Sequence, residues 1–211
     1  MQYKIYLFDF DYTLANSEKA IVTCFQRVLK KNDYPETPDD TIKRTIGMPM
    51  EDALSLLTGE HTSSRIAFLQ EQFSVEANIL MTANTFFFPE TIPTLSALKN
   101  AGAKVGIIST KKRSRIREKL LADDVDNLID IIIGREDVDV PKPSPEGLLL
   151  ALDRLQAKKS EVLYTGDSLI DAHTAKNAQV DFAAVTTGMT TAADFAVLPH
   201  KKILKNLAGL L

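Results

Sequence analysis

The sequence predicts an α/β fold, in which a Rossmann-like parallel sheet forms a core and a smaller α-helical domain is inserted into it. Short continuous apolar runs alternate with helical patterns along most of the chain. Strands that are apolar on both faces are typical of a parallel sheet covered by helices on both sides. A long helical stretch between the first and second apolar runs indicates the insertion.

Five segments have the apolar and β-branched composition of buried strands, at residues 3–9, 104–109, 129–133, 161–166 and 180–185. Helical patterns lie between the later strands, at residues 92–100, 115–121, 145–155 and 169–178. Gly102 follows the first of these helices, where a left-handed residue that ends a helix is expected.

The stretch between the first two strands is too long for a simple crossover and has its own helical periodicity. Apolar residues recur at helical spacing in two longer helices, at Ile21, Phe25, Val28 and Leu29 and at Ile66, Leu69, Phe73 and Leu80. Shorter helices are expected at residues 39–45 and 50–57. The chain is therefore predicted to divide into a core of residues 1–15 and 87–211 and a helical domain of residues 16–86.

The composition, with 45% hydrophobic and 25% charged residues, is ordinary for a soluble globular protein. A net charge of −3 does not favour binding to nucleic acid or to an anionic membrane. The basic run at residues 111–115 is expected to begin a solvated helix. We find no apolar run of ~20 residues and no charged leader before one, so a cytoplasmic protein, monomer or homodimer, is expected.

The first strand ends in two carboxylates, because Asp9 and Asp11 follow the apolar run of residues 5–8. Residues two apart in an extended chain project to the same side, so the two side chains are expected to face one site. Together they can hold a hard divalent cation, with one group left to attack and the other to move protons. Taken alone, an Asp-x-Asp pair also serves turns and helix caps.

Other strands also end in polar residues. Ser109 and Thr110 end the second strand, Asp167 ends the fourth, and Lys142 stands between two prolines. In open parallel sheets the ligand site lies outside the carboxyl ends of the strands. Asp9, Ser109 and Asp167 are therefore expected to meet at one edge of the sheet.

This ordered set of motifs resembles the haloacid dehalogenase superfamily of phosphotransferases, and the resemblance covers nearly the whole chain. It implies a phosphatase that uses Mg2+, with a helical cap inserted after the first motif. It assigns Asp9 as the nucleophile that forms an aspartyl-phosphate. Asp11 becomes the acid/base, and its backbone carbonyl also reaches the metal.

The resemblance gives roles to the remaining motif residues. Thr13 would keep Asp11 oriented, although a simple turn residue is the alternative. Ser109 would hold a phosphoryl oxygen, whereas Thr110 stands where relatives often have asparagine, which leaves the role of its side chain open. Lys142 would neutralise the nucleophile and the phosphate; the alternative is an exposed surface lysine, which its flanking prolines make less fitting.

The metal ligands implied are Asp9, Asp11, Asp167 and Asp171. One helical turn separates Asp167 from Asp171, so their carboxylates can converge on one side. Asp167 is expected to bind the metal directly, and Asp171 to act through a water or as an outer acceptor. The sequence Ala178-Gln179 replaces the Ala-Gly common in relatives, which should alter the helix end only.

The inserted domain is expected to choose the substrate, a small phosphorylated metabolite. Residues 47–54 resemble the cap loop of beta-phosphoglucomutases and phosphoglycolate phosphatases, and residues 185–189 and 193–195 look like the latter branch. Met50 stands where the mutases place an arginine for a second phosphate, so a mutase is disfavoured. Lys43 and Arg44 are candidates to bind a carboxylate or second phosphate, or else are solvated helix charges. A phosphomonoesterase is the main prediction, and a sugar-phosphate mutase or a non-catalytic binding relative are the alternatives.

Overall fold

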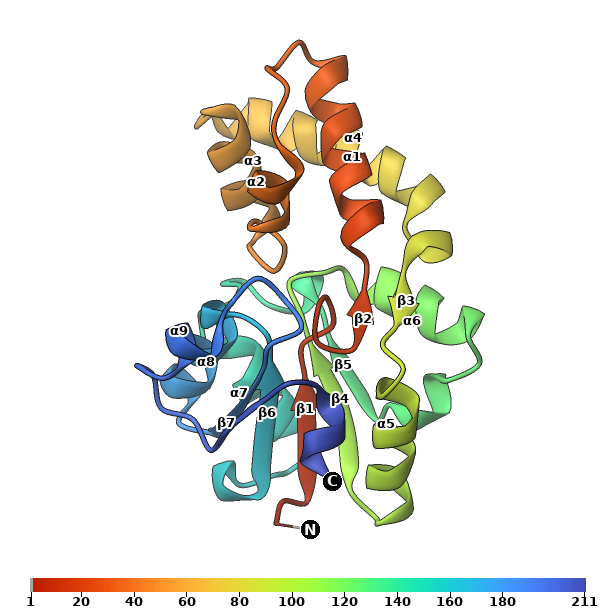
Figure 1. Cartoon of the computed structure of the whole chain (residues 1–211), viewed down its shortest axis with the longest axis vertical. Coiled ribbons are helices and arrows are strands. Elements are labelled where there is room, and N and C mark those ends of the chain that lie inside the picture. Colours follow the sequence, from red (N-terminus) through yellow and green to blue (C-terminus); the bar gives the residue numbers. More distant parts are fainter. Residues whose placement is uncertain (1) are drawn as a thin grey trace.

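A six-stranded parallel sheet forms the core of the larger lobe in the computed structural model, which describes residues 2–211 (Figure 1). The strand order is β5-β4-β1-β6-β7-β8, so the first strand lies in the middle of the sheet. The bounds are β1 (Ile5–Phe8), β4 (Lys104–Ile108), β5 (Ile131–Ile133), β6 (Val162–Gly166), β7 (Asp181–Val185) and β8 (Lys202–Leu204).

Helices cover both faces of this sheet, because each strand has apolar side chains on both sides. Tyr6 and Phe8 of β1 pack with α5 and α6 on one face, and Leu7 packs with α7 and α8 on the other. The helices of this lobe are α5 (Thr91–Asn100), α6 (Arg113–Ala122), α7 (Glu146–Arg154), α8 (Leu169–Ala178) and α9 (Ala192–Phe195). Short 3₁₀ turns are η2 (Asp126–Leu128), η3 (Arg135–Asp137), η4 (Lys159–Glu161) and η5 (Leu207–Leu210).

The predicted α/β core is confirmed, and the five predicted strands are those observed, each with bounds shorter by up to two residues. The sixth strand, β8, was not predicted. Gly102 has a φ of 83° at the end of α5, as expected there. Gln179 ends α8 in the left-handed conformation, with a φ of 59°. Relatives commonly have glycine at this position.

The smaller lobe consists of four helices that pack around an apolar cluster of their own. They are α1 (Glu18–Lys31), α2 (Asp39–Lys43), α3 (Met50–Thr58) and α4 (Ser63–Leu80), followed by the turn η1 (Thr82–Asn84). The rings of Phe25 of α1 and Phe73 of α4 pack against each other with centroids 4.7 Å apart and planes inclined at 50°. Figure 1 shows this lobe above the carboxyl ends of the sheet strands.

Two chain crossings join the lobes, and they pair with each other. β2 (Ala15–Asn16) and β3 (Phe86–Phe87) form an antiparallel ribbon in which Ala15 pairs with Phe87 and Asn16 with Phe86. We propose that the domain boundaries run through this ribbon, with residues 1–15 and 87–211 as the core and 16–86 as the cap. None of the helices within residues 2–211 is both long and apolar enough to span a bilayer.

Candidate active site

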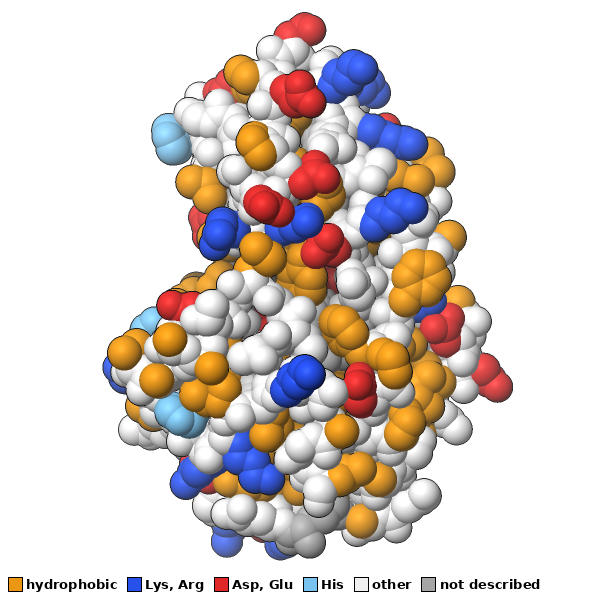
Figure 2. All heavy atoms as spheres, viewed as in Figure 1, with side chains coloured by type: hydrophobic (Ala, Val, Ile, Leu, Met, Phe, Trp, Pro, Cys, Tyr) orange, Lys and Arg blue, Asp and Glu red, His pale blue; other side chains and the backbone are white. Residues whose placement is uncertain are grey.

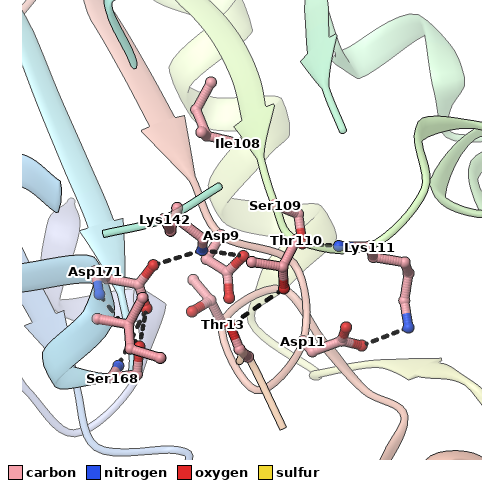
Figure 3. A network of polar contacts seen from close by, with 12 residues as sticks. Asp9, Asp11, Thr13, Ile108, Ser109, Thr110, Lys111, Lys142, Ser168 and Asp171 are labelled. Atoms are coloured by element: carbon pink, nitrogen blue, oxygen red, sulfur yellow. Dashed lines mark hydrogen bonds and ion pairs between the residues drawn. The ribbon is translucent and has the colours of Figure 1, made fainter. Parts of the chain in front are cut away.

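Three buried carboxylates gather at the carboxyl end of the sheet, and Figure 3 labels two of them, Asp9 and Asp171. Asp9 follows β1, Asp167 follows β6, and Asp171 lies in the first turn of α8. One oxygen from each lies within 4.8 Å of the other two. The topology explains this gathering, because β1 and β6 are hydrogen-bonded neighbours that end at the same edge.

Lys142 is enclosed by two of these carboxylates. Its Nζ lies 2.8 Å from Asp9 Oδ1 and 2.6 Å from Asp171 Oδ1, and only 5% of its side chain is exposed. Burial would lower the pKa of Lys142, but the charges of Asp171 and Asp9 outweigh burial and raise the pKa above its ordinary value. The ammonium group therefore stays charged beside Asp9, and the alternative of an exposed surface lysine is wrong.

Asp171 is fully buried, and both of its oxygens accept hydrogen bonds. Oδ1 accepts from Lys142 and from the Tyr164 hydroxyl at 2.7 Å, and Oδ2 accepts from the Ser168 hydroxyl at 2.6 Å and the Ser168 N–H at 3.2 Å. Ser168 and Asp171 form a reciprocal cap at the start of α8. Asp171 thus anchors Lys142 and begins the helix, which agrees with an indirect role toward a metal.

Burial and mutual repulsion destabilise the ionised forms of the three carboxylates unless a positive charge offsets them. Burial raises the pKa of Asp9 to about 6, Lys142 opposes this rise, and Asp171 adds to it. The pKa of Asp167 is well above its usual value because of burial and the nearby Asp171 and Asp9. A divalent cation would relieve this repulsion, as hard carboxylate oxygens are suited to bind it.

Two further features fit a metal site. Oδ1 of Asp9 is buried and makes no aligned hydrogen bond, although it lies 2.8 Å from Lys142 Nζ, so it keeps capacity for a ligand. A Cβ at Gly188, in the segment after β7, would collide with Oδ2 of Asp167. The absence of a side chain at Gly188 therefore leaves space for the carboxylate that we expect to bind the metal.

Asp11 does not join the carboxylate cluster through its side chain. The chain leaves the extended conformation after β1, with a bend at Phe10 between the two acids, so the expected alternation of side chains does not reach Asp11. Its Oδ1 accepts a short hydrogen bond from Ser17 and lies 2.9 Å from Lys111 Nζ. The structure thus gives Asp9 and Asp11 separate partners, as Figure 3 shows.

The prediction that the basic run is solvated is wrong for Lys111, whose side chain is only 8% exposed. Helix α6 begins at Arg113, so Lys111 belongs to the loop that ends β4 and turns toward the site. Sequence reasoning missed this residue because its spacing suggested a helix face. The one available signal was its position two residues after Ser109 at a strand end.

Three other predicted residues have identifiable contacts. Thr13 donates to Asp167 Oδ1 at 3.1 Å. Its hydroxyl therefore holds the expected metal ligand, whereas we had expected it to orient Asp11. Ser109 is buried, and its hydroxyl accepts from the N–H of Lys111 at 3.3 Å. Thr110 donates to the carbonyl of Gly47 at 3.2 Å and so connects the core to the cap loop.

A cavity of about 540 Å³ extends from Asp11 between the two lobes. The cap loop singled out in the sequence, residues 47–54, borders this cavity, because Gly47, Met48, Met50 and Glu51 line it. Lys43 and Arg44 do not line it. Lys43 is paired with Glu18 and Asp40 at 3.3 Å each, and Arg44 is exposed. The cations that do line the cavity belong to the core: Lys111, Lys112, Arg115 and Arg135.

Fold and site together define an α/β enzyme with a buried carboxylate–lysine centre beneath a helical cap. The sequence profile of the haloacid dehalogenase-like hydrolases matches residues 6–185, and the chain belongs to that family. The family resemblance stated from the motifs is thereby confirmed, as is the expectation of an enzyme.

Individual relatives match over almost the whole chain. The pyrophosphatase PpaX of Bacillus velezensis is 27% identical over 205 residues, which cover 97% of this chain and 93% of that protein. PpaX of Halalkalibacterium halodurans is 30% identical over 187 residues, 88% of this chain and 84% of that protein. A haloacid dehalogenase-like hydrolase from Bacteroides fragilis, known from its crystal structure, superposes with a TM-score of 0.97 and 52% identity, covering 99% of this chain and all of that one (100%).

Proposed function

We propose that this phosphatase of the haloacid dehalogenase-like family requires Mg2+ and hydrolyses a small phosphate monoester through an aspartyl-phosphate. The observation that carries the proposal is the buried Asp9 carboxylate, which lies 2.8 Å from the buried Lys142 ammonium at the centre of the sheet edge. An anionic nucleophile can approach a phosphate dianion only where such positive charge offsets the repulsion.

Asp9 and Asp167 would hold the magnesium ion, together with the backbone carbonyl of Asp11 that the family resemblance implies. When bound, the ion would neutralise charge on the phosphoryl oxygens. The residues present fit this role, because their oxygens converge and are only partly satisfied within residues 2–211.

The chain's own groups account for the two chemical steps. In the first, an oxygen of Asp9 forms a bond to phosphorus as the bond to the leaving oxygen breaks, and Asp11 donates its proton to that oxygen. In the second, a water attacks phosphorus, Asp11 accepts the water's proton, and the bond between phosphorus and Asp9 breaks. Inorganic phosphate and the free alcohol are the products.

The neighbouring residues position these groups. Lys142 neutralises Asp9 and a phosphoryl oxygen, and Asp171 and Tyr164 hold Lys142 in place. Ser109 offers a hydroxyl at the end of β4 for another phosphoryl oxygen. Lys111 Nζ lies 2.9 Å from Asp11 Oδ1 and orients Asp11 in its ionised form, the form that accepts the proton of water in the second step.

The sugar-phosphate mutase alternative has no observation in its favour. Met50, which stands where the resemblance places the mutases' arginine, lines the cavity, and a thioether cannot bind a second phosphate. We propose that the enzyme acts on a small phosphorylated metabolite in the cytoplasm, as a monomer or homodimer. Pyrophosphate, which the name of the relative PpaX implies, is one candidate substrate.

The test is the hydrolysis of an aryl phosphate with Mg2+ and with excess chelator, followed by acid quenching to trap the phosphoenzyme. We expect activity only with the metal and a phosphorylated Asp9 in the quenched protein. Asp9→Asn should abolish both activity and labelling, whereas Asp11→Asn should slow turnover by on the order of a hundredfold or more. Full activity in chelator, or in Asp9→Asn, would contradict the proposal.

A further inference from the structure

The cavity between the lobes has two chemically different sides. Every large apolar side chain that lines it comes from the cap: Ile21, Phe25, Ile46, Met48, Met50, Phe73 and Met81. All the cations that line it come from the core. Hydrophobic side chains are visible at the waist between the lobes in Figure 2. A ligand in this space would therefore meet an apolar wall on the cap side.

Three of the four cations already have partners within the protein. Lys111 is paired with Asp11, Arg115 donates to the Ser74 carbonyl and Asn78 Oδ1 at 3.0 and 2.8 Å, and Arg135 donates to the Val138 carbonyl at 3.0 Å. Arg135 also lies 3.6 Å from Glu51. Glu51, Glu71 and Asp11 place three carboxylates in the same lining. The charges of the cavity thus nearly balance, and little positive charge is left over for a second anion.

The position of Asp11 fixes which part of the substrate occupies this space. Asp11 lines the cavity and, in the proposed function, protonates the leaving oxygen. The phosphoryl group itself belongs at Asp9 and Lys142, which do not line the cavity. The leaving alcohol would therefore extend from Asp11 along the apolar wall. A volume of about 540 Å³ is that of a site for a small organic molecule, and exceeds what a second phosphate would fill.

We infer that the enzyme selects phosphate monoesters whose leaving alcohol has an apolar body, in preference to pyrophosphate or to esters with a second anionic group. This inference rests on the proposed function and specifies its substrate class. Met48 and Met50 are the adaptable part of the wall, because they are half-buried and thioether side chains adjust to irregular shapes. Phe25 and Phe73 are its fixed part, since they are buried and their rings pack against each other.

The test measures kcat/KM of the full-length enzyme with Mg2+ for each of five compounds: ethyl, butyl and hexyl phosphate, pyrophosphate and phosphoglycolate. The three alcohols have nearly the same acidity, so differences in kcat/KM report contacts with the leaving group. Burial of each additional CH2 should raise kcat/KM about three- to fourfold until the cavity is filled. Hexyl phosphate should be preferred over ethyl phosphate by on the order of a hundredfold, and over both anionic compounds.

The matched variants are Met50→Gln and Leu56→Gln, both on α3. Met50 lines the cavity, whereas Leu56 is 63% exposed and lies outside it. Glutamine has a similar length but is polar, so Met50→Gln should reduce the ratio of hexyl to ethyl kcat/KM by about three- to tenfold. Leu56→Gln should leave that ratio unchanged.

Three kinds of outcome would overturn the inference, and they can be told apart. Hydrolysis of ethyl phosphate without any gain for the longer esters, or a preference for pyrophosphate or phosphoglycolate, would contradict the apolar selection while keeping the phosphatase. Absence of Mg2+-dependent hydrolysis for every compound would remove the proposed function and the inference with it. An equal fall of the hexyl to ethyl ratio in Met50→Gln and Leu56→Gln would also contradict it.

Discussion

Asp9 and Asp11 stand two residues apart and each faces a different buried lysine. Asp9 is paired with Lys142 and Asp11 with Lys111, and the two lysines come from different loops at the sheet edge. Two carboxylates in different surroundings can take different roles, one as nucleophile and one as acid and base. The two carboxylates have separate partners, and we propose that they take these separate roles.

Replacing Lys111 by glutamine should slow catalysis by loosening Asp11. The variant Lys111→Gln loses the 2.9 Å ion pair, so Asp11 can rotate away from the leaving oxygen. We expect kcat for an aryl phosphate to fall about tenfold, a part of the 10²–10⁴ that positioned acid–base groups contribute. Lys205→Gln, at an exposed lysine that does not line the cavity, is the control and should keep its kcat. Equal kcat values in Lys111→Gln and wild type would show that Asp11 needs no such partner.

Replacing Asp167 by asparagine should weaken metal binding without lowering the stability of the metal-free protein. Without divalent metal, Asp167→Asn removes a buried negative charge beside Asp9 and Asp171, so its Tm should equal or exceed that of wild type. Wild type should gain stability when Mg2+ is added, because the ion binds the folded state only, and the variant should gain much less. Thermal unfolding with and without Mg2+ measures both effects, and the exposed Asp153→Asn is the control. A wild-type Tm unaffected by millimolar Mg2+ would contradict the metal assignment.

At the scale of elements, strands and helices with a full apolar pattern were predictable, and those held by distant pairing were not. The bounds of α8 match the prediction, since Ser168 and Asp171 form a cap that is local in the sequence. Strand β8 has only Ile203 and Leu204 as apolar residues between lysines, and it forms because β7 offers a free edge. The ribbon of β2 and β3 pairs residues about seventy positions apart, which no local pattern reports.

The same distinction applies to the site. The strand-end positions of Asp9, Ser109 and Asp167 follow from topology, and the structure places them at one edge. Side-chain partners depend on the packed structure instead. Thr13 donates to a residue 154 positions away, and Lys111 turns inward from a run of charges that resembled a solvated helix face.

Asp130, the residue before β5, is predicted to stabilise the fold in a pH-dependent way. Asp130 accepts from the N–H of Val105 at 2.7 Å and from Lys99 at 2.6 Å, and Lys104 lies 3.4 Å away. Burial alone would raise the pKa of Asp130, but Lys99, the Val105 N–H and Lys104 outweigh burial and lower it. Because the pKa is lower in the folded state, this carboxylate stabilises the fold above its unfolded pKa of about 3.9. The stabilisation is lost as the pH falls through the folded-state pKa.

Asp130→Asn should therefore reduce the free energy of unfolding at pH 7 by about 1 kcal/mol, a modest value because the group is partly solvated. The difference from wild type should shrink steadily below pH 4. Urea unfolding at pH 7, 5 and 3 measures it, and Asp153→Asn serves as the control for the loss of one surface charge. A difference that stays constant from pH 7 to pH 3 would refute the role of the ionised carboxylate.

At the scale of the whole molecule, the cap and the core have separate apolar clusters, and side-chain polar contacts connect them. The β2–β3 ribbon joins them covalently, and Thr110 contacts Gly47 on one side of the cavity. On the other side Arg115 of α6 reaches α4 through the Ser74 carbonyl and Asn78. Two lobes that have separate apolar clusters are suited to move relative to each other, which is how a cap would admit substrate and exclude water.

Removing the Arg115 contact should loosen the cap without unfolding it. In Arg115→Ala the Ser74 carbonyl and Asn78 lose their donor, so we expect faster hydrogen–deuterium exchange in the last two turns of α4 and in the turn η1. Exchange in β1, β4 and β6 should stay as in wild type, because those strands are buried in the core sheet. The control is Arg117→Ala, an exposed residue on the same helix, which should leave exchange in α4 unchanged. If Arg115→Ala accelerated exchange equally in α4 and in the core strands, the two lobes would unfold as one unit and the independent cap would be refuted.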